Sequence, residues 1–193
     1  MDSVFNNKLN LLHKLTNDTK WDFLYEANGM RFESAQIDDS GFLCVKASGM
    51  INCSASEALD YTWEFTRSAN NVSNVDDTIT LFQILDAKDN SRKFYQANKL
   101  PWPLYPRDLV AMSHKLDDDK SILMYSVPHE VIDTNCVRSD LTISVHAFTD
   151  KGDKCEVIRI AHLNPNGSIP SAIVNMYTDK AAAMIKVLKE KFP

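Results

Sequence analysis

Asn164-Pro165-Asn166-Gly167-Ser168-Ile169-Pro170 separates a β-rich region from an amphipathic C-terminal tail. Pro170 suits the first turn of a helix, where a missing backbone N–H costs nothing. Beyond it, apolar residues recur at helical spacing, which predicts a helix over Pro170–Phe192. Its apolar face carries Ile173, Val174, Tyr177, Ala181, Met184, Ile185, Leu188 and Phe192.

The region before this stretch has the pattern of strands separated by turns. Between Thr78 and Leu163, β-rich runs alternate with turn sequences, which predicts an antiparallel meander. Asn28-Gly29 is a hairpin signal between Trp21–Ala27 and Met30–Ile37, although the first arm also has partly helical character. Phe42–Ile51 supplies a further strand.

Two helices are expected in the first third of the chain. Val4–Leu15 has apolar residues at roughly helical spacing. Ser54-Ala55-Ser56-Glu57 places hydroxyls ahead of a glutamate at capping spacing, which predicts a helix over Ser56–Arg67. Together with the meander and the final helix, these elements predict an α+β fold in which a curved antiparallel sheet wraps around the long C-terminal helix.

Composition narrows the class of protein. With 193 residues, 44% of them hydrophobic and 24% charged, the chain can bury a full core, and we expect residues 1–193 to form a single domain. The four cysteines show no CxxC spacing, so we expect reduced thiols and no metal site. The formal charge of −5 argues against a nucleic-acid partner.

The sequence also indicates where the protein works. The first residues carry no apolar run typical of a secretory signal, and no stretch is long and apolar enough to span a bilayer. Neither end carries a lipidation signal. We therefore expect a cytoplasmic monomer whose contact with membranes is transient and peripheral.

Three motifs resemble the START (StAR-related lipid-transfer) domain family. They are Pro106-Arg107-Asp108-Leu109-Val110, Val137-Arg138 and Asn164-Pro165-x-Gly167-x-Ile169-Pro170-Ser171-x-x-Val174-Asn175, and the resemblance runs from about Trp21 to Phe192. The Asn-Pro-x-Gly-x-Ile-Pro form is similar to the phosphatidylcholine-transfer branch. The resemblance implies a helix-grip fold in which the sheet and the last helix enclose a hydrophobic tunnel for one lipid. Periodicity alone does not distinguish such a tunnel from a filled core.

The resemblance implies lipid transfer between membranes, with the Pro-rich loop and the C-terminal helix as the gate. In that loop, Trp102 and Leu104 are the candidates for membrane docking, because an indole favours the headgroup level of a bilayer. The alternative for Trp102 is an ordinary buried tryptophan beneath the loop. On the last helix, Ile173, Tyr177 and Met184 are candidates for the apolar lid over the lipid.

A buried lipid headgroup needs polar partners on otherwise apolar strands. Ser113, Tyr125, Arg138, His146, Arg159 and His162 have this position in the sequence. Of these, Ser113, Tyr125, Arg138 and His162 are assigned to the polar end of the lipid site. For His162, a histidine satisfied within the core is the alternative. Arg107 and Asp108 are expected mainly to anchor the loop to its strand.

Departures from the family pattern bear on the lipid class. Sterol-type members have an arginine six residues after that of Arg-Asp, whereas this chain has Ser113, so phospholipid is favoured over sterol. Arg67 alone is similar to the arginine that contacts phospholipid phosphate. Two alternatives stay open: a lipid-sensing regulatory module, and an enzyme acting on an apolar small molecule through His162 or Tyr125. No cofactor is implied and no catalytic residue is assigned.

Overall fold

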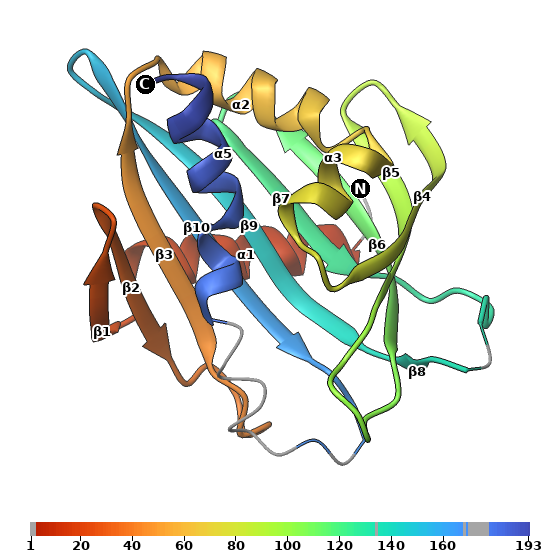
Figure 1. The fold of residues 1–193 in the computed structure, drawn as a ribbon. Helices are drawn as coiled ribbons and strands as arrows, with labels where there is room; N and C mark the ends of the chain where they lie inside the picture. Colours follow the sequence, from red (N-terminus) through yellow and green to blue (C-terminus); the bar gives the residue numbers. More distant parts are fainter. Residues whose placement is uncertain (1–2, 134, 168, 170–177) are drawn as a thin grey trace.

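The computed structural model describes residues 3–133, 135–167, 169 and 178–193, and its centre is one curved sheet (Figure 1). The sheet has ten strands in the order β1-β2-β3-β10-β9-β7-β6-β5-β4, with β8 beside β6. The strands are β1 Asp22–Ala27, β2 Met30–Ala35, β3 Cys44–Ile51, β4 Ile79–Lys88, β5 Ser91–Asn98, β6 Arg107–Leu116, β7 Ser121–Ser126, β8 Val137–Arg138, β9 Asp140–Lys151 and β10 Lys154–Asn164.

The strand order confirms the expected meander. From β4 to β10 each long strand pairs with the next long strand along the chain, and all these pairs are antiparallel. The first three strands join the far side of the same sheet, because β3 pairs with β10. β8 runs parallel to β6 and places Arg138 beside Asp108. The segment Trp21–Ala27, left open between strand and helix, contributes strand β1.

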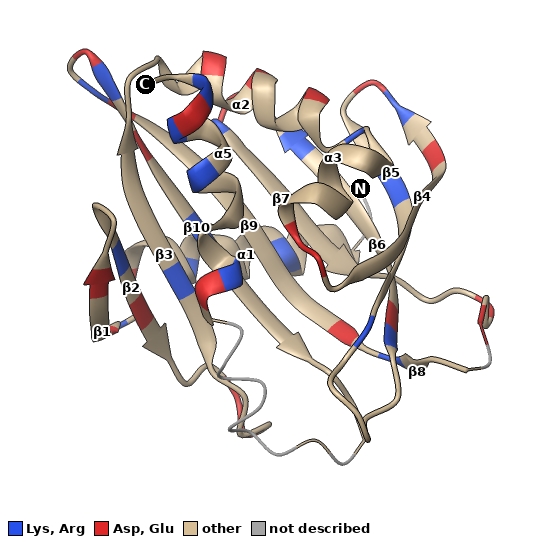
Figure 2. Ribbon diagram, in the orientation of Figure 1, with Lys and Arg blue, Asp and Glu red and all other residues tan. Residues whose placement is uncertain are grey.

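Helices cover both faces of the sheet. α1 (Ser3–Asn17) lies across the outer face, whereas α2 (Ala55–Phe65), α3 (Ala69–Val75), the 3-10 helix η1 (Thr178–Ala182) and α5 (Ala183–Lys191) lie on the inner face (Figure 1). Charged residues mark α2, α5 and the tip of the β9–β10 hairpin (Figure 2). None of the described helices is long and apolar enough to cross a membrane.

Local sequence explains the start of α2. The Ser54 hydroxyl accepts a hydrogen bond from the Glu57 backbone N–H at 3.2 Å, and the Glu57 carboxylate accepts one from the Ser54 N–H at 2.9 Å. This capping box satisfies two backbone donors at the helix end, so the helix begins at Ala55 rather than at Ser56. α3 was not predicted, because Asn and Ser are weak helix formers and its helical pattern is short.

The C-terminal helix differs in part from its prediction. The segment 170–177 lies outside the described residues, and the described part begins with a 3-10 turn before α5 starts at Ala183. Ile185 and Leu188 of α5 are fully buried in a core cluster with Phe148 and Val157 of the sheet. The sheet therefore grips the last helix, as the sequence predicted.

A second core cluster occupies the outer face. Leu12 and Leu15 of α1 pack against Ile143, Val145 and Ile160. As a result, the central strands β7, β9 and β10 bury apolar side chains on both faces. This arrangement determines which polar side chains can reach the inner face.

Candidate functional site

A cavity of about 320 Å³ lies on the inner face, between the sheet and the start of the C-terminal helix. Its wall is apolar along β10, β9 and β6, where Ala161, Leu141 and Leu109 contribute side chains. Thr178 and Ala181 of η1 line it from the helix side. The remaining lining residues are Leu43, Val45, Asp76, Thr78, Phe94, Gln96, Asn98, Leu100, Arg107, Asp108, Met124, Ser139, Ser144, Arg159, Leu163, Pro165, Ile169 and Lys180.

The cavity has an inner end and an outer end. Along β10, Val157 belongs to the filled core, whereas Arg159, Ala161 and Leu163 line the cavity. Pro165 and the Pro-rich loop residue Leu100 also line it. Arg159 therefore stands where the filled core stops, and the Pro-rich loop lies toward the opposite end.

Arg107 ties the two loop segments together at this outer end. Its Nε donates to the carbonyl oxygen of Pro165 at 2.8 Å, its Nη2 to that of Asn166 at 3.1 Å, and its Nη1 to that of Tyr105 at 2.6 Å. Gly167 has a positive φ of 67°, and a Cβ there would lie 3.4 Å from Arg107 Nη2. Arg107 thus anchors both loops, as the sequence predicted.

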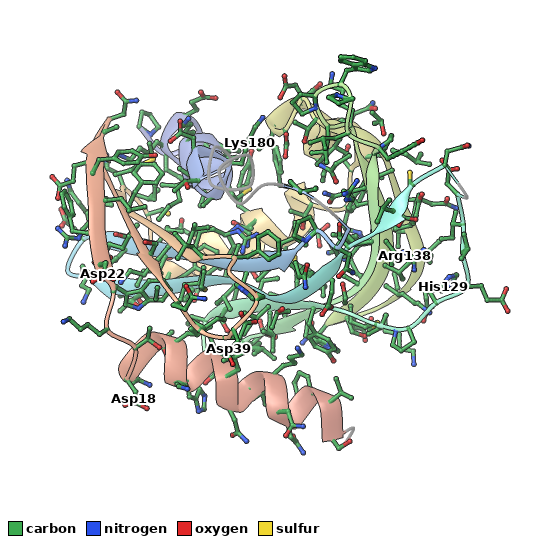
Figure 3. All side chains as sticks on the ribbon, turned by 90° about the horizontal axis from the view of Figure 1, so that it is seen from below. Asp18, Asp22, Asp39, His129, Arg138 and Lys180 are labelled. Carbon is green, nitrogen blue, oxygen red and sulfur yellow. The ribbon has the colours of Figure 1, made fainter. Side chains whose placement is uncertain are left out.

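Arg138 forms a two-hydrogen-bond pair with Asp108, which is 2% exposed and lines the cavity. Arg138 itself is not among the residues that line the cavity, and its Nη1 also approaches the His129 carbonyl oxygen at 3.5 Å (Figure 3). The hydrogen bond to Asp108 raises the pKa of Arg138. Arg138 therefore holds the cavity-lining Asp108 in place without lining the cavity itself.

Arg159 and His146 face each other across the β9–β10 ladder. Arg159 Nη1 donates to the carbonyl oxygens of Ile160 at 2.5 Å and Val145 at 3.3 Å. Burial lowers the pKa of Arg159 to about 10, so the side chain stays charged at neutral pH. Burial and the neighbouring arginine hold the pKa of His146 well below its usual value, so its imidazole is neutral.

Ion pairs hold the start of the C-terminal helix in place. Lys180 Nζ lies 2.9 Å from Asp76 Oδ1 and 2.6 Å from Asp77 Oδ1, and this joins η1 to the end of α3 (Figure 3). Lys189 Nζ donates to the carbonyl oxygens of Asn28 and Gly29 at 3.0 Å each. We call Lys180 with Asp76 and Asp77 the η1 latch.

The Pro-rich loop presents aromatic side chains to solvent. Trp102 is 92% exposed and Tyr105 is 72% exposed, whereas Leu104 is half-buried. The alternative of a tryptophan buried beneath the loop is therefore wrong. In the loop between β7 and β8, Val131 is also 70% exposed.

The other predicted residues are not brought together at the cavity. Tyr125 and His162 lie on the outer face, where the Tyr125 hydroxyl is 3.1 Å from His114 Nε2 and His162 Nε2 is 3.2 Å from the Phe42 carbonyl oxygen. Ser113 is on the inner face but beyond the cavity, opposite Arg92 of β5. Met184 packs into the filled core. Ile173 and Tyr177 lie outside the described residues.

Sequence reasoning included Arg159 and His146 among its polar candidates but did not select them. The sequence pattern that could have identified them is their alternation with apolar neighbours. His162, which lies on the other face of the sheet, shows the same pattern, so the pattern could not separate these residues. Arg92, whose guanidinium lies 3.6 Å from the centre of the Trp63 ring, was not considered. Among the described residues, no group of three or more His, Cys, Asp or Glu side chains is placed to hold a metal ion.

Comparisons with known proteins agree with the sequence motifs. The START domain family model matches residues 77–192. The ceramide transfer protein of Mus musculus is 21% identical over 202 residues, covering 90% of this chain and 32% of that protein. The ceramide transfer protein of Homo sapiens is 20% identical over 200 residues, covering 90% and 31%. The chain thus spans about a third of the length of the curated relatives it matches.

Solved structures share the fold at low sequence identity. The crystal structure of human STARD10 superposes with a TM-score of 0.77 at 17% identity and covers 98% of this chain and 79% of that chain. Human StAR-related lipid transfer protein 5 gives a TM-score of 0.77 at 16% identity and covers 96% and 92%. A STAR-related lipid transfer protein fragment from Xanthomonas axonopodis gives 0.72 at 21% identity and covers 90% and 98%.

The helix-grip fold predicted from the sequence is therefore confirmed. The family model matches more than half of the 193 residues, and the match covers strands β4 to β10 and α5. The chain belongs to the START domain family.

Proposed function

We propose that residues 1–193 act as one lipid-binding domain that takes a single lipid into the inner-face cavity and moves it between membranes. The observation that carries this proposal is the cavity itself, which has an apolar wall and lies between the sheet and η1 in a START domain. A lipid chain in water faces a cost of about 0.8 kcal/mol per CH₂, so an apolar cavity removes a large barrier to transfer.

Loading requires the cavity to widen. At roughly 30 Å³ per water-sized group, a volume of about 320 Å³ holds about ten such groups, far fewer than a two-chain lipid contains. The movable boundary is the C-terminal helix, because η1 is held by the η1 latch at the surface rather than by deep packing alone. We propose that the η1 latch and the Pro-rich loop open together.

Opening would take place at a membrane surface. Trp102 and Tyr105 offer exposed aromatic rings between prolines, and a proline-rich loop loses less entropy on docking than a flexible one. Leu104 lies between them and is available if the loop inserts. We propose Trp102 as the main docking residue and Leu104 as its apolar support.

For the lipid class we favour a phospholipid over a sterol. Support comes from Ser113, which stands where sterol-type members have an arginine, and from the charged Arg159 in the cavity wall. Because ceramide transfer proteins are among the relatives, a sphingolipid should also be tested as a ligand.

Native mass spectrometry of gently purified protein, followed by lipid extraction, tests binding. A single lipid at one-to-one stoichiometry is expected, and a protein that stays empty after incubation with phospholipid, ceramide and sterol vesicles would refute the proposal. Movement of labelled lipid between donor and acceptor vesicles at substoichiometric protein separates transfer from sensing. The enzymatic alternative relied on His162 and Tyr125, but Tyr125 packs in the outer-face cluster with α1 and His162 lies against the loop at Phe42, so neither lines the cavity and we do not pursue it.

A further inference from the structure

Arg159 has no acidic partner near its guanidinium among the residues that the structure describes. Its hydrogen bonds go from Nη1 to two backbone carbonyl oxygens, and within the described residues no carboxylate lies within ion-pairing distance. Residues 170–177, which lie outside the described part, contain no Asp or Glu in the sequence. Arg159 thus carries a positive charge into the cavity wall without a negative charge to match it.

Three of the other charged residues of the cavity wall, Asp76, Asp108 and Lys180, are paired with opposite charges, whereas Arg107 is bound by backbone carbonyl oxygens. Asp76 is matched by Lys180, and Asp108 by Arg138. Arg107 uses Nε, Nη1 and Nη2 on three carbonyl oxygens of the loops. Among the described residues that line the cavity, Arg159 therefore differs from Arg107 in that its hydrogen bonds use Nη1 alone, which leaves Nε and Nη2 for a ligand.

The surroundings of Arg159 increase its need for an anion. His146 opposite is neutral and buried, and its Nδ1 has no hydrogen-bond partner in the described structure. Ser144, one alternating position further along β9, adds a hydroxyl to the same cavity wall. A charge in a low-dielectric site destabilises the protein unless it is paired and hydrogen-bonded. Without an anion in the cavity, the Arg159 charge is therefore not compensated.

We propose that Arg159, with Ser144 beside it, binds the oxyanion of a lipid, either a phosphate ester or a carboxylate, at the inner end of the cavity. This inference rests on the proposed lipid-binding function and narrows its ligand class. Guanidinium matches both groups because its planar N–H donors can form two parallel hydrogen bonds to their oxygens. The apolar chain then runs outward along Ala161, Leu163 and Leu109 toward the Pro-rich loop.

Paired ligands that differ in the oxyanion alone test the proposal. Native mass spectrometry and competition binding would compare oleate with oleyl alcohol, and phosphatidic acid with the diacylglycerol of the same chains. The variants are Arg159→Met, which removes the charge, and Arg159→Lys, which keeps it. Arg31→Met is the matched control, because Arg31 is about half exposed, pairs with Glu26 on the surface and does not line the cavity.

We expect the unaltered protein and Arg31→Met to prefer the anionic member of at least one pair by tenfold or more, which is the usual effect of a hydrogen-bonded charge. Arg159→Met should lose this preference yet still bind the neutral member within about twofold, and Arg159→Lys should keep part of it. Arg159→Met should unfold at the same or a higher temperature, because it removes an unpaired buried charge.

Three different results would contradict three different parts of the proposal. If Arg159→Met keeps the full preference for the anionic lipid, the assignment of Arg159 is wrong while lipid binding stands. If inorganic phosphate alone binds as tightly as phosphatidic acid and depends on Arg159, the site takes a free anion and the lipid ligand class is wrong. If the unaltered protein binds none of the four lipids, the proposed function fails together with this inference.

Discussion

The Arg138 guanidinium holds the buried Asp108 carboxylate through two hydrogen bonds, Nε to Oδ1 at 2.8 Å and Nη2 to Oδ2 at 3.1 Å. Asp108 is 2% exposed and lines the cavity, whereas the Arg138 side chain is 32% exposed and approaches from β8. The pair joins β6 to the short parallel strand β8 and leaves Asp108 no free charge to present to a ligand.

Arg138→Met should lower the free energy of unfolding by about 1–3 kcal/mol, because it leaves the buried Asp108 carboxylate without its partner. The loss of stability stays moderate because the Arg138 side chain is partly exposed to solvent. Urea denaturation measures this value. Asp108→Asn combined with Arg138→Met should recover part of it. Arg67→Met, which breaks an exposed pair with Glu64, is the control and should change stability by less than about 1 kcal/mol. An Arg138→Met variant of unaltered stability would contradict a structural role.

Ala181→Phe should abolish lipid uptake, because Ala181 is buried and lines the cavity from η1. The added ring fills space that the ligand needs. Ala183→Phe is the matched control, since Ala183 faces a groove between α5, α2 and α3 instead. Native mass spectrometry after incubation with vesicles reports the bound fraction. Equal uptake by Ala181→Phe and the unaltered protein would show that the ligand lies elsewhere.

Trp102→Ala should slow lipid transfer between vesicles at least severalfold without changing the melting temperature. The ring is 92% exposed, so its removal costs little folding energy, but it takes away the main apolar contact with a bilayer. Leu81→Ala removes a side chain that is 48% exposed on β4 and serves as the control. Transfer rates that fall equally in both variants would argue against a specific docking loop.

Lys180→Met should speed the loading and release of lipid, because it removes the η1 latch. Exposed ion pairs weaken as salt rises, so the unaltered protein should also load faster at high salt, whereas Lys180→Met should respond less. Lys186→Met, on the next turns of the same helix, is the control. Stopped-flow fluorescence of a labelled lipid measures both rates. If the two variants load at the same rate, the latch does not limit opening.

Stability should fall on acidification from about pH 7 to pH 5. The pKa of His146 is lowered in the folded state by burial and by Arg159, so the unfolded chain binds the proton first. The contribution of His146 is therefore complete above the unfolded pKa of about 6.5 and decreases below it, by at most about 1.4 kcal/mol per pH unit. Burial also lowers the pKa of His114, which adds a similar dependence.

Urea denaturation at several pH values tests this dependence. His146→Gln should flatten the slope between pH 7 and pH 5 but not remove it, because His114 remains. His13→Gln alters an exposed histidine of α1 and should leave the slope unchanged. An unchanged slope in His146→Gln would mean that His146 binds its proton equally well in the folded and the unfolded protein, which would contradict the lowered pKa.

Local patterns in the sequence were sufficient to predict most of the helices and strands. The capping residues Ser54 and Glu57, the Asn28-Gly29 turn and the apolar face that includes Ile185 and Leu188 each act over a few residues. The first two elements formed close to where they were expected, and of the predicted last helix the described part is α-helical from Ala183. α3 was missed because its seven residues carry no strong helical pattern and depend on Ser68 as a cap. The anchoring role of Arg107 followed from motif resemblance and is realised by hydrogen bonds to both loops.

The sequence by itself determined the order of strands and helices, because turns, caps and apolar periodicity are local. The tertiary structure alone decided which polar residues reach the cavity. α1 covers the outer face of β9 and β10, so both faces of these strands are apolar and alternation cannot tell inside from outside. His162 and Arg159 therefore looked equivalent in sequence, yet His162 lies against the loop at Phe42 and Arg159 lines the cavity, because alternate residues of a strand point to opposite faces of the sheet.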